Sequence, residues 1–532
     1  MQGKIKILEG EIRGYINSPW DTKKEVPEYI SVDEALFLEG VYIAEIDFQD
    51  GSKLVYPSLS GGYDLYYAFY NNQICYDTDF FNLAKKVGEI SFDKKQISFF
   101  LDKGYLEQGK TLFSQIFRVE LGCGLYIESN GEYQIIVLKQ KNWKIGYEEF
   151  VSSIKNSIEM YLDDNSNNAL LFSGGKDSGF LATFLKKEFD ISPILYTGKI
   201  SNPSGFDMNE SDTYRSEMYS KELGLVHKVV DINANQYTFE DIAYLVKKMP
   251  LAAHAAFLFD KIFLDIKETS GDEMTVWTGQ NADTVYGCGF TGSNIPNMLA
   301  RYFFTDSYLK SLSDTENHLF GKMISELVCL GYQFKRKEKL YPPKKSEDLY
   351  RTILNGNIMM SKCPCLRADK KNISYDEIWH RIWEIYQSAH VTGMDHQVIR
   401  NVGNEKIRRC FPFSAVGSMM MFRSVRFTSK DVFEPKRFIA QYLKDFWGKE
   451  KFQELYPTDW KVFRKNTNII DHESRIMNNT EYGASLSRFV EMECNNVVRM
   501  QHVLSSAWIK ELSIQLMNEG VCINDECTKK NV

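Results

Sequence analysis

Apolar and aromatic residues alternate with polar ones along residues 40–48 and 63–70, and Gly and Asn turns separate these runs. A period of two is that of a half-buried strand, so residues 1–140 are predicted to form a sheet-based domain. From Tyr147 the period changes to four, which predicts an amphipathic helix with its apolar side at Phe150, Ile154, Ile158 and Leu162. We therefore expect a domain boundary near Ile145, between a domain of residues 1–145 and a domain of residues 146–532.

The second domain alternates predicted strands and helices. The strands are residues 168–172, 193–197, 227–232 and 274–278, and the helices between the first three are residues 179–187 and 213–223. This order implies right-handed crossovers and an α/β fold with a doubly wound parallel sheet. Beyond Phe290 the pattern is mainly helical, with helices predicted at residues 324–331, 375–389 and 438–447.

A glycine-rich turn, Ser173-Gly174-Gly175-Lys176-Asp177-Ser178, connects the first of these strands to the first helix. A helix N-terminus offers unpaired N–H groups and a positive dipole, so the turn is predicted to bind phosphate. The glycines let the backbone close on the phosphate oxygens, and the two serines add hydroxyl donors. Asp177 would repel bare phosphate and is expected to hold magnesium. The alternative is a chance Ser/Gly turn with a helix cap.

The turn is not a Walker A loop, because no Gly-Lys-Ser/Thr follows at the required spacing. Lys176 stands at the variable position and is expected to be solvated. A second carboxylate, Asp283, follows the strand at residues 274–278. Ligands bind beyond the carboxyl ends of parallel strands, so Asp177 and Asp283 are expected to grip one magnesium ion that bridges the phosphates of ATP.

The composition excludes several classes of function. The chain has 532 residues, 43% hydrophobic and 25% charged, which is ordinary for a soluble protein of two to four domains. A net charge of −7 argues against a nucleic-acid partner, and the basic run at residues 335–339 is interpreted as a solvated helix face, with a local contact as the alternative. No apolar run is long enough for a membrane span, so a cytoplasmic location is expected.

Cysteine usage supports the same compartment. Ten scattered cysteines form no dense framework, so reduced thiols are expected. The pair in Cys363-Pro364-Cys365 has no matching second pair. Ordinary thiols are therefore the main interpretation, and a zinc site or persulfide chemistry is the alternative.

The pattern Ser-Gly-Gly-Xaa-Asp-Ser resembles the pyrophosphate loop of the ATP pyrophosphatase (PP-loop) superfamily. Taken with the segments around it, the chain resembles the asparagine synthetase family, which includes β-lactam synthetases and lasso peptide cyclases. In the first domain the resemblance rests on residues 99–105, Thr111-Leu112-Phe113, Ile116, Gly122 and Gly124-Leu125. In the second it rests on residues 173–178, Glu210, Asp212, Leu223-Gly224, His227, residues 278–287 and Cys410-Phe411-Pro412-Phe413.

This resemblance implies an α+β N-terminal domain of the glutaminase type, an Ntn-hydrolase-like sheet sandwich. It implies that a PP-loop domain with a helical C-terminal part follows, and that ATP and Mg²⁺ are the cofactors. Carried over by position, Leu171 and Thr197 would line the adenine pocket with main-chain groups, and Thr278 and Gly279 would border the ribose and α-phosphate. Pyrophosphate would be held by Ser173, Gly174, Gly175 and Ser178. Lys465 matches the lysine that stabilises charge in catalysis, with Lys461, Arg464 or a solvated basic turn as alternatives.

The first domain departs from the family at its catalytic positions. Glutamine-hydrolysing members begin, after Met removal, with a cysteine whose α-amine is the general base, whereas this chain has Gln2. The first cysteine, Cys75, lies inside a predicted strand. Asn130-Gly131-Glu132 stands between two predicted strands, where Asn-Gly is a hairpin turn. The first domain is therefore predicted to be a degenerate scaffold without glutaminase activity.

Two departures concern the second domain. Gln280 replaces the glutamate of asparagine synthetases and the tyrosine of β-lactam synthetases; an amide can orient a nucleophile but cannot deprotonate it. Ser414 follows Pro412-Phe413 where the family usually has Leu-Asp, so packing around the acyl pocket is expected to differ.

The resemblance predicts an ATP-dependent, AMP-forming ligase that adenylates a carboxylate and joins it to an amine of the substrate itself or of a peptide. Small molecules or peptides carrying both groups are the expected substrates, nucleic acid and membranes are not expected partners, and a homodimer is compatible with this interpretation. An asparagine synthetase using ammonia or a separate glutaminase is one alternative. A degenerate ATP-binding module that serves a partner protein is another.

Overall fold

The computed structural model describes most of the chain outside two long stretches, residues 283–395 and 457–499. The described residues are 2–71, 73–94, 96–97, 100, 106, 109–139, 143, 146–162, 167–201, 210–233, 238–253, 256–271, 274–282, 396–403, 406–422, 436–456 and 500–524. Several predictions fall outside them: the helices at 324–331 and 375–389, the basic run at 335–339, Cys363-Pro364-Cys365, Asp283 and Lys465. None of the described helices is both long and apolar enough to cross a bilayer.

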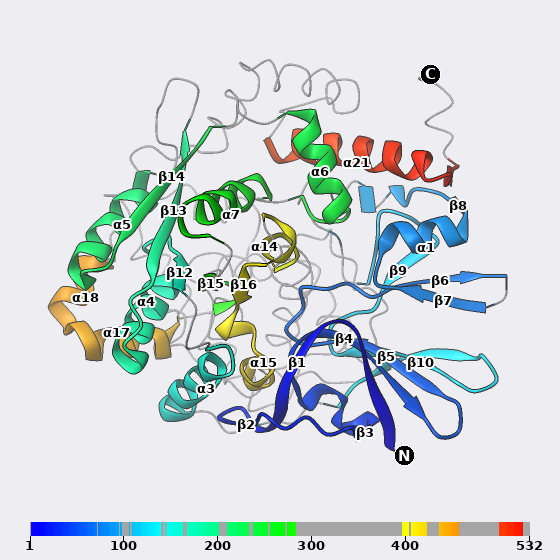
Figure 1. Cartoon of the computed structure of the whole chain (residues 1–532), viewed down its shortest axis with the longest axis horizontal. Coiled ribbons are helices and arrows are strands. Elements are labelled where there is room, and N and C mark those ends of the chain that lie inside the picture. Colours follow the sequence, from blue (N-terminus) through cyan, green and yellow to red (C-terminus); the bar gives the residue numbers. More distant parts are fainter. Residues whose placement is uncertain are drawn as a thin grey trace, which may run out of the picture.

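The N-terminal part is built on sheets, as predicted, and the strands of its two main sheets pair antiparallel. Its larger sheet has the order β11-β10-β5-β4-β1-β2, and β3 pairs with β1. These strands are β1 (Gln2–Ser18), β2 (Asp21–Lys23), β3 (Tyr29–Ser31), β4 (Leu38–Phe48), β5 (Lys53–Pro57), β10 (Cys123–Ile127) and β11 (Tyr133–Val137). In Figure 1 most of them lie at the lower right, around the N-terminus. The predicted strand at residues 40–48 is thus confirmed within β4.

A smaller antiparallel sheet has the order β7-β6-β9, from β6 (Tyr66–Tyr70), β7 (Gln73–Asp77) and β9 (Ile116–Arg118), and α1 (Phe80–Val87) packs beside it. Cys75 lies within β7, which confirms its predicted place in a strand, and its side chain is buried. The Asn130-Gly131 hairpin is also confirmed: β10 and β11 pair antiparallel, and Gly131 has φ +87° in the turn between them.

The second part contains a five-stranded parallel sheet of order β14-β13-β12-β15-β16. Its strands are β12 (Asn167–Leu171), β13 (Ile194–Ser201), β14 (His227–Asn233), β15 (Met274–Thr278) and β16 (Arg408–Cys410). The predicted α/β arrangement is confirmed for the first four strands. The fifth, β16, was not predicted, because three residues are too few to show a period.

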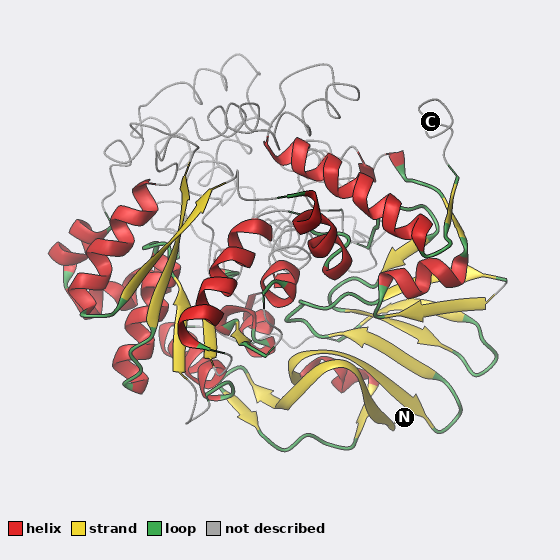
Figure 2. Ribbon diagram, turned by 45° about the horizontal axis from the view of Figure 1, so that its top comes forward, coloured by secondary structure: helices red, strands yellow, loops and turns green. Residues whose placement is uncertain are grey.

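Helices cover both faces of this sheet (Figure 2). Leu170 and Leu195 pack with α4 (Lys176–Phe189) and α5 (Glu210–Leu223) in one core. Ala169 and Tyr196, which point to the opposite face, pack with α6 (Phe239–Lys248) and α7 (Ala256–Ser270) in another. Such double cover explains why the strands are near-continuous apolar runs rather than alternating ones.

Packing continues across the predicted boundary near residue 145. One core joins Tyr42 of β4 to Phe150 of α3 (Tyr147–Glu159) and to Met419 of α15 (Val416–Phe422). At the far end of the chain, α21 (Met500–Asn518) packs against α6, as Figure 1 shows at upper right. The short strand β17 (Cys522–Ile523) pairs in parallel with β8 (Glu89–Ile90). The division into domains of residues 1–145 and 146–532 stays a prediction.

Ser414 forms a buried hydrogen bond with His396. It ends the short helix η6 (Pro412–Ser414), is 1% exposed, and its Oγ lies 3.0 Å from Nε2 of His396. The other ring nitrogen, Nδ1, lies 3.0 Å from the carbonyl oxygen of Ser60. Burial lowers the pKa of His396 to about 3, so the ring is neutral and both of its nitrogens have hydrogen-bond partners.

Candidate functional site

The predicted phosphate loop, residues 173–178, lies at the carboxyl end of the central strand β12. Leu171 is in register with Tyr196 of β13 on one side and with Thr278 of β15 on the other. Ser173 is exposed, and α4 begins at Lys176, with Gly175 as its N-cap in an extended conformation. The helix starts three residues earlier than predicted, so Asp177 and Ser178 belong to its first turn. The N-terminus of a helix generally favours a negatively charged group.

Two glycines allow close approach of three segments at this point. Gly174 has φ +66°, and a Cβ there would lie 2.6 Å from the backbone nitrogen of Ser216 in α5. A Cβ on Gly279, which follows β15, would lie 3.0 Å from the nitrogen of Ser178. Side chains at these positions would push α5 and the end of β15 away from the loop. The loop, α5 and residues after β15 therefore form one compact cradle.

The hydroxyls of the loop lie next to each other. Ser178 Oγ lies 3.3 Å from the backbone nitrogen of Ser173 and 3.4 Å from its Oγ. Gly175 donates its N–H to Ser173 Oγ at 3.3 Å. These contacts are long for hydrogen bonds, so both hydroxyls can turn toward a ligand at little cost.

The segment after β15 meets the loop as expected. Gln280 is half-buried and donates its backbone N–H to Thr278 Oγ1 at 3.3 Å. Asn281 has φ +73°, a left-handed conformation, and its Nδ2 contacts the Met419 sulfur at 3.1 Å. This sharp turn brings Gly279 against the loop. Asp283, the second predicted magnesium ligand, lies outside the described residues, and so does Lys465.

Asp177 has a partner that the sequence interpretation missed. Lys436 Nζ forms an ion pair with Asp177 Oδ2, and both side chains are largely buried, at 11% and 20% exposure. Lys436 precedes α17 (Arg437–Trp447) and has φ +62°, which non-glycine residues rarely adopt. The one available signal was a basic residue at the start of the predicted helix 438–447, where the helix dipole disfavours positive charge.

Lys176 is not solvated, contrary to the prediction. It is half-buried, and its Nζ lies 5.8 Å from the centre of the Phe452 ring on α18 (Lys449–Leu455). Burial, followed by the charges of Lys436 and Lys444, lowers the pKa of Lys176 to about 8, although Asp177 opposes this. The prediction failed because α18 lies far away in the chain and nothing near Lys176 indicates its cover. Lys176, Lys436 and Lys444 therefore place three positive charges near the start of α4, where the helix dipole also favours an anion.

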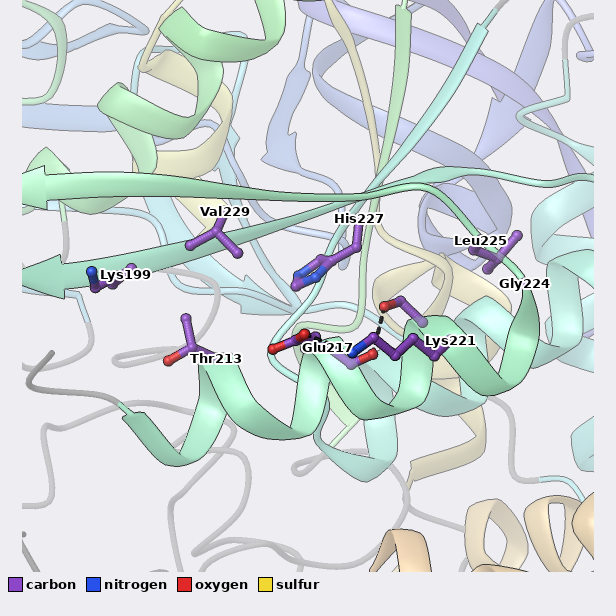
Figure 3. Close-up of a pocket in the computed structure, with 9 residues that line it drawn as sticks. Lys199, Thr213, Glu217, Lys221, Gly224, Leu225, His227 and Val229 are labelled. Carbon is purple, nitrogen blue, oxygen red and sulfur yellow. Dashed lines mark hydrogen bonds and ion pairs between the residues drawn. The ribbon is translucent and has the colours of Figure 1, made fainter.

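Thr197 and Leu171, which the resemblance assigns to an adenine pocket, lie on the neighbouring strands β13 and β12. Thr197 is 2% exposed and its Oγ1 lies 2.5 Å from the carbonyl oxygen of Phe172. Beyond it a groove of about 650 Å³ opens between α5 and the strands β13 and β14, shown in Figure 3. Its lining includes Lys199, Glu217, Leu225, His227 and Val229.

The residues present fit a nucleoside triphosphate with magnesium. The space beside Gly174 and Gly279 is one that a Cβ on either residue would fill. The N-terminus of α4 and the serine hydroxyls suit phosphate oxygens. The Asp177 carboxylate is a hard oxygen ligand of the type that magnesium prefers. Lys436, which pairs with Asp177, adds a positive charge close to the start of α4. Among the described residues, no group of three or more His, Cys, Asp and Glu side chains could hold a metal ion.

Comparisons with known proteins add little to this geometry. Neither protein-family models nor curated proteins give a match. Among solved structures, the chain is similar to an NH3-dependent NAD synthetase from Campylobacter jejuni, with 12% identity and a TM-score of 0.22, over 41% of this chain and 99% of that one. It is also similar to the U34-tRNA thiolase NcsA from Methanococcus maripaludis, with 13% identity and a TM-score of 0.20, over 43% and 86%. Scores this low carry no weight on function.

Proposed function

We propose that the protein is an ATP-dependent synthetase that adenylates a carboxylate and joins it to an amine, with release of AMP and pyrophosphate. The observation that carries the proposal is the cradle at the carboxyl end of β12, where Gly174 and Gly279 allow α5, the loop and the end of β15 to meet. A loop of this kind holds oxygens tightly on several sides, which suits a leaving pyrophosphate.

Within this cradle, Ser173, Gly174, Gly175 and Ser178 would hold the β- and γ-phosphates. Leu171 and Thr197 would bound the adenine, while Thr278 and Gly279 would border the ribose and α-phosphate. Asp177 would bind magnesium together with Asp283, and bound magnesium would neutralise charge on the phosphates. Lys436, which pairs with Asp177 in this structure, would contact phosphate oxygens. Lys465 would stabilise charge during adenylation or amide formation.

The attacking amine is proposed to come from the substrate or from a peptide, as in β-lactam synthetases and lasso peptide cyclases. Gln280 stands beside Thr278 and can orient such an amine, but its amide cannot take up a proton. The N-terminal sheets are proposed to be an Ntn-type sandwich without glutaminase activity. Cys75 supports this, because it is buried in the middle of β7 rather than at a chain terminus, where a cysteine nucleophile of this type stands.

The test is pyrophosphate release from ATP, measured against amino acids, amino-acid-like acids and peptides. Asp177→Asn should abolish release while leaving the far-ultraviolet circular dichroism unchanged, because the amide is a poor magnesium ligand. Asp190→Asn is the matched control: it removes the same charge from the other end of α4, where Asp190 has φ +56°, a conformation that asparagine tolerates. Full turnover in Asp177→Asn would overturn the assignment, and ATP binding without any turnover would favour a binding module.

A further inference from the structure

A chain of polar groups connects the edge strand β14 to the backbone that enters the phosphate loop. Thr197 Oγ1 lies 2.5 Å from the carbonyl oxygen of Phe172, the residue before Ser173. The same Oγ1 lies 2.9 Å from Nε2 of His227, the first residue of β14. Phe172 also donates its N–H to the Tyr196 carbonyl at 2.8 Å. Both polar groups of the Phe172 backbone are therefore tied to β13.

The chemistry of these groups determines where the protons lie. A carbonyl oxygen can only accept, so the single hydroxyl proton of Thr197 is donated to Phe172. The contact with His227 then requires a proton on Nε2, which donates to Thr197 Oγ1. His227 is thus held as the Nε2–H tautomer, and Nδ1 is left for the groove.

The surroundings of His227 keep its ring neutral near pH 7. In Figure 3 the ring points from β14 toward α5, into the groove that Glu217 and Lys221 also line. Partial burial lowers the pKa of His227, and the charge of Glu217 opposes this only in part. Nδ1 is then an acceptor, and Nε2 remains the donor to Thr197.

We propose that His227 is a positioning residue for the phosphate loop. By holding the Thr197 hydroxyl, it aligns the Phe172 carbonyl and so the direction in which the backbone enters Ser173. His227 acts through two hydrogen bonds, one to Thr197 and one from Thr197 to Phe172, the residue that precedes the loop. The inference rests on the proposed function, since the loop is taken to hold ATP.

The test compares His227→Ala with His227→Gln, whose amide N–H can occupy the place of Nε2–H. Loss of one hydrogen bond that forms equally before and during the reaction should raise KM for ATP roughly 5- to 10-fold in His227→Ala, with kcat within about twofold. His227→Gln should restore KM to within about twofold of the wild type. Lys221→Ala is the control, because it alters the same groove but contacts Glu217 rather than Thr197.

Substitutions at Thr197 provide a second test of the same inference. Thr197→Val should raise KM at least as much as His227→Ala, and the double variant should be no worse than Thr197→Val alone. The inference is overturned if His227→Ala keeps a wild-type KM, if His227→Gln is as impaired as His227→Ala, or if the two sites act additively. A lower Tm with unchanged KM would also overturn it.

Nitrogen-15 NMR separates this inference from the proposed function. Without any nucleotide, His227 should show a protonated Nε2 that Thr197→Val perturbs, and His227→Ala should shift the amide signals of Ser173 and Gly174. A ring protonated only at Nδ1, or unmoved loop amides, would overturn the inference. If the wild type binds no ATP but these signals behave as expected, the proposed function fails and the positioning role stands.

Discussion

Individual side chains set the charge balance at the phosphate loop. Asp177 places a carboxylate in the first turn of α4, where the helix dipole favours it, and the Lys436 ammonium binds that carboxylate directly. Lys176 stands next to both with its pKa lowered to about 8, so it loses part of its charge under mildly alkaline conditions. An anion bound at this point would raise the pKa of Lys176 and so keep its ammonium group fully charged.

Gln280→Ala tests the division between adenylation and amide formation. The backbone of Gln280 supports the turn after β15, whereas its side-chain amide is the part available to an attacking amine. Substrate-dependent exchange of pyrophosphate into ATP should persist within a few-fold, while product formation should fall on the order of a hundredfold, as when one transition-state hydrogen bond is lost. Gln441→Ala, on an exposed position of α17, is the control. Equal loss of exchange and product would assign Gln280 to the nucleotide site instead.

At the scale of elements, α17 contributes to the site through its N-terminus and packs along α4. Phe438 stacks on Phe150 with ring centres 5.5 Å apart, and Tyr442 contacts Phe180 at 5.0 Å. These aromatic contacts fix the position of α17 and therefore of Lys436, because Lys436 directly precedes the helix. A cation at a helix N-terminus is unfavourable in isolation, so the Asp177 carboxylate and an incoming phosphate compensate for it.

Lys436→Met tests this contribution. A hydrogen bond to a charged group is worth about 1.5–3 kcal/mol, so KM for ATP should rise roughly 10- to 100-fold. Lys449→Met removes the same charge from an exposed position on the neighbouring α18 and should leave KM within about twofold. Titration of Lys176 gives a second measurement: its pKa should move upward in Lys436→Met, because Lys436 is one of the groups that lower it. An unchanged KM together with an unchanged titration would contradict the role given to Lys436.

At the scale of the whole molecule, the N-terminal strands and the second part of the chain are joined by a buried carboxylate. Glu39 of β4 is 1% exposed and accepts N–H groups from Val416 and Gly417, at 3.1 and 3.3 Å. Gly40 donates to it as well, at 3.2 Å. Burial nevertheless outweighs these bonds and raises the pKa of Glu39 to about 7.

Glu39 should therefore make the free energy of unfolding depend on pH. Because its folded pKa is raised above the ordinary 4.5, its contribution is complete below about pH 4.5 and is lost as pH rises through 7. The loss by pH 8 is on the order of a few kcal/mol. Glu39→Gln keeps a carbonyl acceptor but has no charge, so it should be more stable than the wild type at pH 8 and similar at pH 5. Urea unfolding at both pH values measures this, and equal pH dependence in the two proteins would contradict it.

Local pattern alone predicted the strands β4, β12, β13, β14 and β15, the hairpin at Asn130-Gly131, and the strand–loop–helix around Ser173. These features depend on neighbours within a few residues, through side-chain period, turn geometry and the needs of a helix N-terminus. Tertiary structure alone decided that β16 completes the sheet, that Phe452 covers Lys176, and that Lys436 reaches Asp177 across 259 residues. It also decided that His227 holds Thr197. Such contacts depend on which distant surfaces the chain buries together, and no local period records that choice.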